Sequence, residues 1–323
     1  MSILDYVGNT PLLELEGYEK QNDLKARIYG KLEFFNPTGS VKDRVAKQMI
    51  LQAEKEGKLK PGDTIFENTS GNTGISMAAL GAAKGYKVVI ALEPGVSIER
   101  SQILHAYGAE LMSFLDVPNV AEVMMSPNAT FQSTLVPMGE YAASHGYFYT
   151  NQCANDANVQ AHYETTAPEI WNQLEGKVDI FVAMCGTGGT ITGVSRYLKE
   201  QNPDVKIVLA LPDADSLPAP GKTTPKIDGI LKLNGRSDPM APIFFKKYGF
   251  NYDEEIIVSA KNAYKVAHEI AASDGLFIGE SSAAVLVAAK ELADRPENKG
   301  KNIVVLMADG GQKYLSSMFK EED

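Results

Sequence analysis

Residues 179–190 read Asp-Ile-Phe-Val-Ala-Met-Cys-Gly-Thr-Gly-Gly-Thr, and this stretch decides the fold. Its first half is a short apolar run, which is typical of a strand buried inside a parallel sheet. A tight turn follows, made of Gly186, Thr187, Gly188, Gly189 and Thr190. A helical pattern then runs over residues 191–201. Because a strand, a glycine-rich turn and a helix in this order indicate a parallel sheet covered by helices, we expect an α/β fold.

The turn at residues 186–190 has the composition of an anion-binding site. Its glycines let the backbone bend tightly, and the helix start supplies N–H donors and the positive end of a dipole. We therefore predict a phosphate cradle. A dinucleotide fingerprint does not match, because its third glycine would fall at Ile191. A P-loop at Gly221-Lys222-Thr223 also fails, because Ser216 stands where its first glycine is required.

Short apolar runs and helical patterns alternate along the rest of the chain as well. We predict further strands at residues 26–29, 87–92, 207–211 and 302–307. Further helices are predicted at residues 40–56, 71–85, 261–273 and 282–293. Segments 116–132 and 212–241, which contain several prolines, are expected to be long functional loops.

A second polar cluster reads Asn68-Thr69-Ser70-Gly71-Asn72-Thr73-Gly74 and precedes an alanine-rich helical pattern. Hydroxyls, amides and the N–H groups of a helix start converge in such a loop. Because several uncharged donors can hold a carboxylate, we predict a carboxylate-binding loop here. A loop that only caps the helix is the alternative.

A lysine in an unusual place is the third feature. Residues 36–44 read Asn-Pro-Thr-Gly-Ser-Val-Lys-Asp-Arg, with Ser40 as the expected N-cap of a helix and Lys42 in its first turn. The positive end of the helix dipole disfavours the charged ammonium group and lowers the pKa of Lys42. A neutral amine can attack a carbonyl and form a Schiff base. By itself Lys42 could be a solvated surface lysine, and the two neighbouring anion-binding loops favour the catalytic interpretation.

Composition excludes several classes of function. The 323 residues have a net charge of -10, which is unfavourable for binding nucleic acid, and charged residues interrupt every apolar run before the roughly 20 residues of a membrane span. The N-terminal residues do not resemble a secretory signal, so we expect a cytoplasmic protein. Cys153 and Cys185 are expected to be reduced thiols, and no spacing of cysteines or histidines indicates a metal site.

Together, these features resemble the fold-type II family of pyridoxal phosphate (PLP) enzymes, in particular its cysteine synthase (O-acetylserine sulfhydrylase) and cystathionine β-synthase branch. The similar segments are residues 7–12, 36–44, 69–74, 164–170, 186–190 and 279–282. The resemblance implies two three-layer α/β domains with mostly parallel, twisted sheets. Residues 1–40 and 155–323 would form a large cofactor-binding domain. Residues 41–154 would form a smaller, mobile domain that carries the carboxylate loop.

The resemblance also implies a role for each matching residue. Lys42 would hold PLP as a Schiff base and then act as the base at the substrate Cα. Residues 186–190 would bind the phosphate, and Asn72 the ring hydroxyl. Ser281 would face the pyridine nitrogen, with Ser282 as the alternative, because Glu280 replaces a residue that is usually small or apolar. The substrate carboxylate would be bound by Thr69, Ser70, Asn72, Thr73 and Gln152.

A serine at the pyridine nitrogen has a chemical consequence. A hydroxyl is too weakly acidic to protonate the ring, so a carbanion is short-lived and a leaving group on Cβ departs quickly. We therefore expect β-replacement on O-acetylserine, serine or cysteine through an α-aminoacrylate, with sulfide, a thiol or water as the nucleophile. β-Elimination alone, as in a cysteine desulfhydrase or serine dehydratase, is one alternative. A non-catalytic, cofactor-binding regulatory protein is another.

Specificity and partners depend on smaller features. Asp228 stands where the family commonly has glutamine or glutamate, so it is either a base for the incoming nucleophile or a loop cap. The resemblance implies a homodimer, and it leaves open whether the tail of a serine acetyltransferase binds in the cleft.

Overall fold

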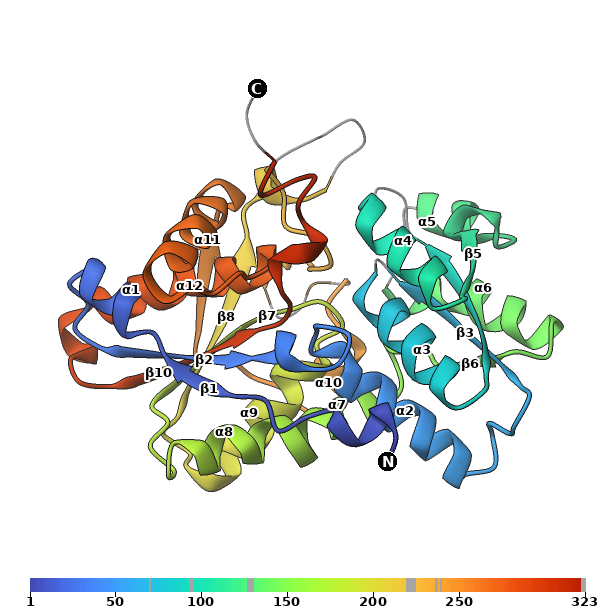
Figure 1. Ribbon diagram of the computed structural model, residues 1–323, viewed down its shortest axis with the longest axis horizontal. Coiled ribbons are helices and arrows are strands. Elements are labelled where there is room, and N and C mark those ends of the chain that lie inside the picture. Colours follow the sequence, from blue (N-terminus) through green and yellow to red (C-terminus); the bar gives the residue numbers. More distant parts are fainter. Residues whose placement is uncertain are drawn as a thin grey trace.

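Two separate sheets organise the molecule, one in each lobe of the computed structural model (Figure 1). The structure describes residues 1–69, 71–92, 96–126, 131–218, 225–235, 238 and 240–320, without the side chains of Phe131 and Thr134.

The larger sheet has six strands in the order β1-β2-β10-β7-β8-β9. Every neighbouring pair is parallel except β1 and β2. The strands are β1 (Leu12–Glu14), β2 (Arg27–Leu32), β7 (Ile180–Met184), β8 (Lys206–Pro212), β9 (Glu254–Val258) and β10 (Asn302–Met307).

Helices cover both faces of this sheet, because its inner strands are apolar on both faces. Ile180 and Val182 of β7 pack in the core beneath α11 (Ala260–Asp274) and α12 (Glu280–Asp294). Phe181 and Ala183 pack in the opposite core, against α8 (Ala167–Gln173) and α9 (Gly189–Gln201). Figure 1 shows α11 and α12 above the sheet and α8 and α9 below it. This three-layer arrangement fixes β7 and the turn that follows it.

The smaller sheet has four parallel strands in the order β5-β4-β3-β6. The strands are β3 (Thr64–Thr69), β4 (Lys87–Leu92), β5 (Glu110–Ser113) and β6 (Phe148–Tyr149). One face packs against α2 (Lys42–Lys55), α3 (Asn72–Ala83) and α4 (Ile98–Ala106). The other face packs against α5 (Val120–Met125) and α6 (Phe131–Ser144).

Shorter elements connect these layers. The α-helices are α1 (Glu16–Gln21), α7 (Ala157–Ala161) and α10 (Ile243–Lys247), and η4 (His162–Thr166) is a π-helical turn. The 3₁₀ helices are η1 (Ile3–Tyr6), η2 (Glu33–Phe35), η3 (Phe114–Asp116), η5 (Ala214–Ser216), η6 (Pro296–Asn298) and η7 (Gly311–Lys313).

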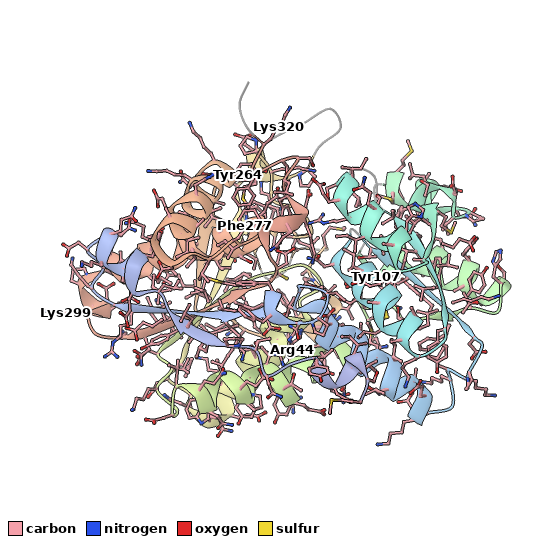
Figure 2. All side chains as sticks on the ribbon, viewed as in Figure 1. Arg44, Tyr107, Tyr264, Phe277, Lys299 and Lys320 are labelled. Carbon is pink, nitrogen blue, oxygen red and sulfur yellow. The ribbon has the colours of Figure 1, made fainter. Side chains whose placement is uncertain are left out.

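A buried ion-pair network joins α2 to the larger sheet. Arg44, where the two lobes meet in Figure 2, donates to Glu33 at 2.7 Å and to Glu169 of α8 at 2.6 Å. Lys31 of β2 donates to Glu169 as well, at 2.7 Å. Burial raises the pKa of Glu169, but the hydrogen bonds and charges of Arg44 and Lys31 outweigh it and lower that pKa to about 2. The network therefore anchors α2, the helix that begins with Lys42.

The α/β class with mostly parallel sheets is confirmed, and several boundaries differ from the sequence predictions. Helix α2 begins at Lys42 with Val41 at the N-cap position. The backbone of Ser40 pairs with Asp309 in an isolated bridge, and its Oγ atom accepts from the N–H of Lys42 at 3.3 Å. Helix α9 begins two residues earlier than predicted, at Gly189.

The structure contradicts one of the two predicted loops and describes the other only in part. The expectation of a loop at 116–132 was wrong, since α5 lies inside it and α6 begins within it. Within 212–241 the structure describes only the end of β8 and the short turn η5 as regular, while residues 219–224, 236–237 and 239 lie outside the described residues.

Candidate active site

A cavity of about 520 Å³ is lined by residues from both lobes, that of the larger sheet and that of the smaller sheet. The predicted site residues in its wall are Lys42, Thr69, Asn72, Thr73, Gln152, Gly186, Thr187, Gly188, Thr190, Asp228 and Ser281. The carboxyl ends of β3 and β7 open onto it, which is where parallel α/β sheets bind ligands. Gly189 does not line the cavity, and Ser70 lies outside the described residues.

Lys42 is the first residue of α2 and lies in the cavity wall. Burial lowers the pKa of its amine, and the nearby groups of Cys153, Asp309 and Cys185 oppose that shift only in part. The start of a helix disfavours a positive charge too. An amine that loses its proton more easily than an ordinary lysine can react with an aldehyde.

The turn between β7 and α9 forms a cradle for an anion. Gly188 has a φ of 82°, a left-handed conformation that favours glycine. Among the described residues, none accepts a hydrogen bond from the backbone N–H groups of Gly186, Thr187 or Gly188. Unused N–H groups at the start of a helix are the donors that phosphate groups require. The residues present therefore fit the phosphate of PLP.

Two residues that the sequence analysis missed support this cradle. The Asn158 Nδ2 atom donates to Thr187 Oγ1 at 2.9 Å, and His162 Nε2 lies 3.1 Å from Thr190 Oγ1. Burial and the charges of Lys42 and Arg44 lower the pKa of His162 well below its ordinary value. A neutral imidazole next to the cradle orients the threonine without adding charge. Both residues lie just before the predicted motif 164–170, which was the only sequence signal near them.

Gly188 provides a test of the cradle. We expect Gly188→Ala to weaken PLP binding about 10- to 100-fold, because losing one or two hydrogen bonds to a charged group reduces affinity by about this factor. A Cβ atom there would lie 2.7 Å from Pro242 Cβ and displace the turn, with left-handed strain in addition. Equilibrium titration of the apoenzyme with PLP measures this. The control is Gly275→Ala, with the same left-handed φ but open space around its Cβ, and equal losses in both variants would contradict the assignment.

The carboxylate loop connects β3 to α3. Thr69 Oγ1 accepts from the N–H of Gly71, and Thr73 Oγ1 donates to Gln152 Oε1 at 2.5 Å. Gly71 has a φ of 146°, which turns the chain into the first turn of α3. Hydroxyl, amide and helix N–H groups are thereby grouped on one side of the cavity. This grouping fits a carboxylate ligand.

Asn72 makes two contacts that the sequence did not indicate. Its Nδ2 atom donates to Asp309 Oδ2 at 2.7 Å, and its Oδ1 atom accepts from Lys313 Nζ at 2.9 Å. An amide can donate two hydrogen bonds and accept two. Asn72 therefore retains capacity for the ring hydroxyl of a cofactor.

The two candidate serines at the start of α12 have different surroundings. Ser281 lines the cavity. Ser282 is buried, and its Oγ atom donates to the carbonyl of Asp309 at 3.1 Å and accepts from the N–H of Asp309 at 3.3 Å. Ser281 is thus the serine with access to a ligand.

Asp228 lies in the cavity wall between two cations. Its carboxylate is 3.4 Å from Arg100 Nη1 and 3.1 Å from Lys226 Nζ. Arg100 belongs to α4 in the smaller sheet's unit, and it also donates to Tyr314 Oη at 2.7 Å. Arg100 and Tyr314, neither of which was predicted, therefore connect the two units at the cavity.

Glu280 is a buried carboxyl group next to this site. It accepts the Asp228 N–H at 2.9 Å and the Tyr264 hydroxyl at 2.9 Å. Burial first, and then the charge of Asp228, raise its pKa from 4.5 to about 7, against the opposing effects of those hydrogen bonds and of Arg100.

This raised pKa predicts a pH-dependent stability. The folded state favours protonated Glu280. The stability that this carboxyl group contributes is therefore fully present below about pH 4.5 and is lost as the pH rises to about 7. The side chain of Glu280→Gln does not titrate, so the variant does not lose this stability. The unfolding free energy of the variant minus that of the wild type should therefore rise by up to about 3 kcal/mol between pH 5 and pH 8. Urea denaturation at both pH values measures the difference. Glu291→Gln, at an exposed position of the same helix, is the control, and a pH-independent difference for Glu280→Gln would contradict the prediction.

None of the helices in the described part of the chain has the length and apolar character needed to cross a bilayer. The described residues also contain no group of three or more His, Cys, Asp or Glu side chains placed to hold a metal ion.

A lysine with a lowered pKa, a glycine-rich turn at a helix start and a loop of hydroxyl and amide groups line one cavity. These groups fit the class of enzymes that use a phosphorylated aldehyde cofactor and act on an amino acid. The family model for pyridoxal-phosphate dependent enzymes matches residues 3–309. The chain belongs to this family, and its cofactor is PLP.

Three known proteins illustrate the range of relatives. A cysteine synthase from Staphylococcus aureus is 39% identical over 317 residues, 98% of this chain and 96% of that protein. The crystal structure of an O-ureido-L-serine synthase is similar with a TM-score of 0.82 and 34% identity, over 100% of this chain and 96% of that one. The crystal structure of a hydrogen sulfide-producing enzyme from Fusobacterium nucleatum gives a TM-score of 0.80 and 34% identity, over 97% of this chain and 99% of that one.

Proposed function

We propose that this enzyme catalyses β-replacement on O-acetylserine, serine or cysteine, with sulfide, a thiol or water as the nucleophile. The observation that carries the proposal is that Lys42, the phosphate cradle and the carboxylate loop line one cavity, and that Ser281, not the neighbouring acid Glu280, lines it from α12. The similar cysteine synthase and O-ureido-L-serine synthase support the same reaction class.

Each group in the cavity has a distinct task in this proposal. PLP, when bound, withdraws electrons from the substrate Cα. Lys42 holds the cofactor and moves the Cα proton, and the turn at residues 186–190 fixes the phosphate. The loop at residues 69–73, with Gln152, holds the substrate carboxylate. Ser281 faces the ring nitrogen without protonating it, which favours loss of a leaving group from Cβ over transamination.

We further propose that residues 41–154 move as a smaller domain against residues 1–40 and 155–323. The smaller sheet lies entirely within residues 64–149, which supports this division. Arg100 reaches from the smaller unit to Asp228 and Tyr314 of the larger one. Movement of the carboxylate loop and α4 together would close the cavity and exclude water.

The proposed partners follow from the surface. A homodimer is supported by exposed apolar side chains at Ile3, Tyr6, Leu13 and Phe35, which a second copy would bury. A serine acetyltransferase tail would occupy the carboxylate loop, so it would compete with the amino-acid substrate. We also propose a cytoplasmic location, which fits the finding that neither Cys153 nor Cys185 forms a disulfide in the described part of the chain.

Product analysis tests the reaction. The purified holoenzyme is mixed in turn with O-acetylserine, serine and cysteine, with and without sulfide or 2-mercaptoethanol. New amino-acid products support β-replacement, whereas pyruvate alone would identify a β-elimination enzyme such as a desulfhydrase or dehydratase. The hydrogen sulfide-producing relative makes cysteine the most informative substrate for this distinction. No spectral change with any substrate would indicate a non-catalytic, cofactor-binding protein.

A further inference from the structure

Residues 226–228 lie in a segment whose backbone is held at three consecutive positions. The Lys226 N–H donates to Tyr264 Oη at 3.3 Å, and the Ile227 N–H donates to the carbonyl of Ser216 at 2.8 Å. The third, the Asp228 N–H, donates to Glu280 Oε2 at 2.9 Å. Ile227 has no exposed surface, which fixes the segment from the opposite side. Asp228 therefore extends from a rigid support.

Glu280 is the central group of this support. It is fully buried, and its Oε1 atom accepts from Tyr264 at 2.9 Å and from Ser317 at 3.3 Å. Tyr264, labelled in Figure 2, thus contacts both Glu280 and the Lys226 N–H. The carboxylate of Glu280 makes no contact with the cavity itself, since Glu280 is not among the described residues that line it. Its hydrogen bond to the Asp228 N–H gives it a direct contact with a residue that does line the cavity.

The observed orientation of Asp228 satisfies these contacts together with its ion pairs. The N–H points to α12, while the carboxylate points to Arg100 in the cavity wall and to Lys226. A shift of about 1 Å in a catalytic group can cost about 100-fold in rate. Without an acceptor at Glu280, the partly buried Asp228 N–H would also lose its partner.

We propose that Glu280 is a positioning residue that fixes the backbone of Asp228, so that the Asp228 carboxylate meets the incoming nucleophile. The proposal rests on the β-replacement reaction and adds to it the residue that selects nucleophiles needing a base. Glu280 acts on the second half-reaction, in which the nucleophile adds to Cβ, and leaves the release of the leaving group unchanged.

Two substitutions separate positioning from charge. In Glu280→Gln the amide oxygen can still accept the Asp228 N–H, and the amide nitrogen can donate to the hydroxyls of Tyr264 and Ser317. Glu280→Ala removes the acceptor. Ser317→Ala removes the weaker 3.3 Å contact to Glu280 and a 3.4 Å contact to the Tyr314 carbonyl, but it leaves the acceptor of the Asp228 N–H in place, so it is the matched control.

The first readout does not depend on activity. Hydrogen exchange at the Asp228 amide of the substrate-free holoenzyme should become faster in Glu280→Ala and stay near wild type in Glu280→Gln and Ser317→Ala. Unchanged exchange in Glu280→Ala would overturn the proposal. This readout is valid even if the wild-type enzyme catalyses elimination alone, so failure of the proposal is distinguishable from failure of the proposed reaction.

The second readout is a double-mutant cycle with Asp228. Glu280→Ala should slow addition of 2-mercaptoethanol by up to about 100-fold, with release of acetate from O-acetylserine unchanged. Glu280→Gln should restore most of that rate. Because Glu280 acts through Asp228, the Asp228→Asn/Glu280→Ala variant should be no slower than Asp228→Asn alone. The proposal would be overturned if the rate loss of the double variant equalled the product of the two single losses. It would also be overturned if Glu280→Gln and Glu280→Ala lost the same amount of rate.

Discussion

Lys42→Ala is expected to reduce turnover by about 10,000-fold or more while the protein remains folded. The Cα base by itself accounts for about 100- to 10,000-fold, and the variant also loses the amine that holds the cofactor. The fold should survive, because Lys42 faces the cavity and α2 is anchored by Arg44. Turnover of O-acetylserine with sulfide measures the loss, and circular dichroism with thermal melting monitors the fold.

The same assignment can be tested chemically. Borohydride treatment of the wild-type holoenzyme links the cofactor permanently to the amine that holds it, and peptide mapping then identifies the residue. Lys313 is the informative competitor, because burial lowers its pKa as well and it contacts Asn72 at 2.9 Å. Lys47→Ala, on the same helix but outside the cavity wall, is the control and should keep full activity. Label on Lys313 would reject Lys42.

Features encoded in short segments were predictable from the sequence. The turn at residues 186–190 combines a strand end, glycines and a helix start within a dozen residues, so local rules define it. Strands β4 and β10 have the predicted boundaries, since each consists of one polar residue followed by five apolar ones. The positions of Asn72 and Lys42 at helix starts were predictable for the same reason, whereas carboxylate binding by the loop before α3 stays a prediction.

Contacts between distant segments were not predictable in this way. Arg100 and Asp228 are 128 positions apart in the chain, and they meet only because the two lobes with their separate sheets lie side by side. His162 lies in a π-helical turn, and nothing in the local pattern places its imidazole against Thr190. Ser40 was assigned as a cap from composition, whereas its backbone pairs with Asp309 near the far end of the chain. Tertiary pairing decided each of these cases.

Glu280 was partly visible in the sequence and partly not. The sequence shows that it replaces a residue that is usually small or apolar in the family, and this made the choice between Ser281 and Ser282 less certain. In the structure it contacts Asp228, which lies 52 positions earlier, and Tyr264. A burial-raised pKa near 7 could not be inferred from an isolated glutamate at a helix start, where the dipole favours the charged form. The role proposed for Glu280 therefore rests on contacts that only the fold brings together.

Asp228→Asn is expected to slow the second half-reaction by about 100- to 10,000-fold with water or a thiol, the range for removal of a general base. Release of the leaving group should continue at the wild-type rate, because Lys42 serves that step. Rapid-mixing measurements with O-acetylserine separate the two phases, since a first phase without a second indicates a block at nucleophile addition. Asp228→Glu keeps the carboxylate beside Arg100 and Lys226, and it should recover part of the rate.

The choice of nucleophile decides what Asp228 does. Sulfide is largely ionised near neutral pH and needs little help from a base, whereas water and thiols must lose a proton as they add. A loss in Asp228→Asn with water and 2-mercaptoethanol, but not with sulfide, identifies Asp228 as the base and points away from a dedicated cysteine synthase. If all three nucleophiles react equally fast with variant and wild type, Asp228 only pairs with Arg100 and Lys226 and caps its loop. Because Arg100 comes from the smaller sheet's unit, the variant should then instead weaken closure of the cavity and raise the KM for O-acetylserine.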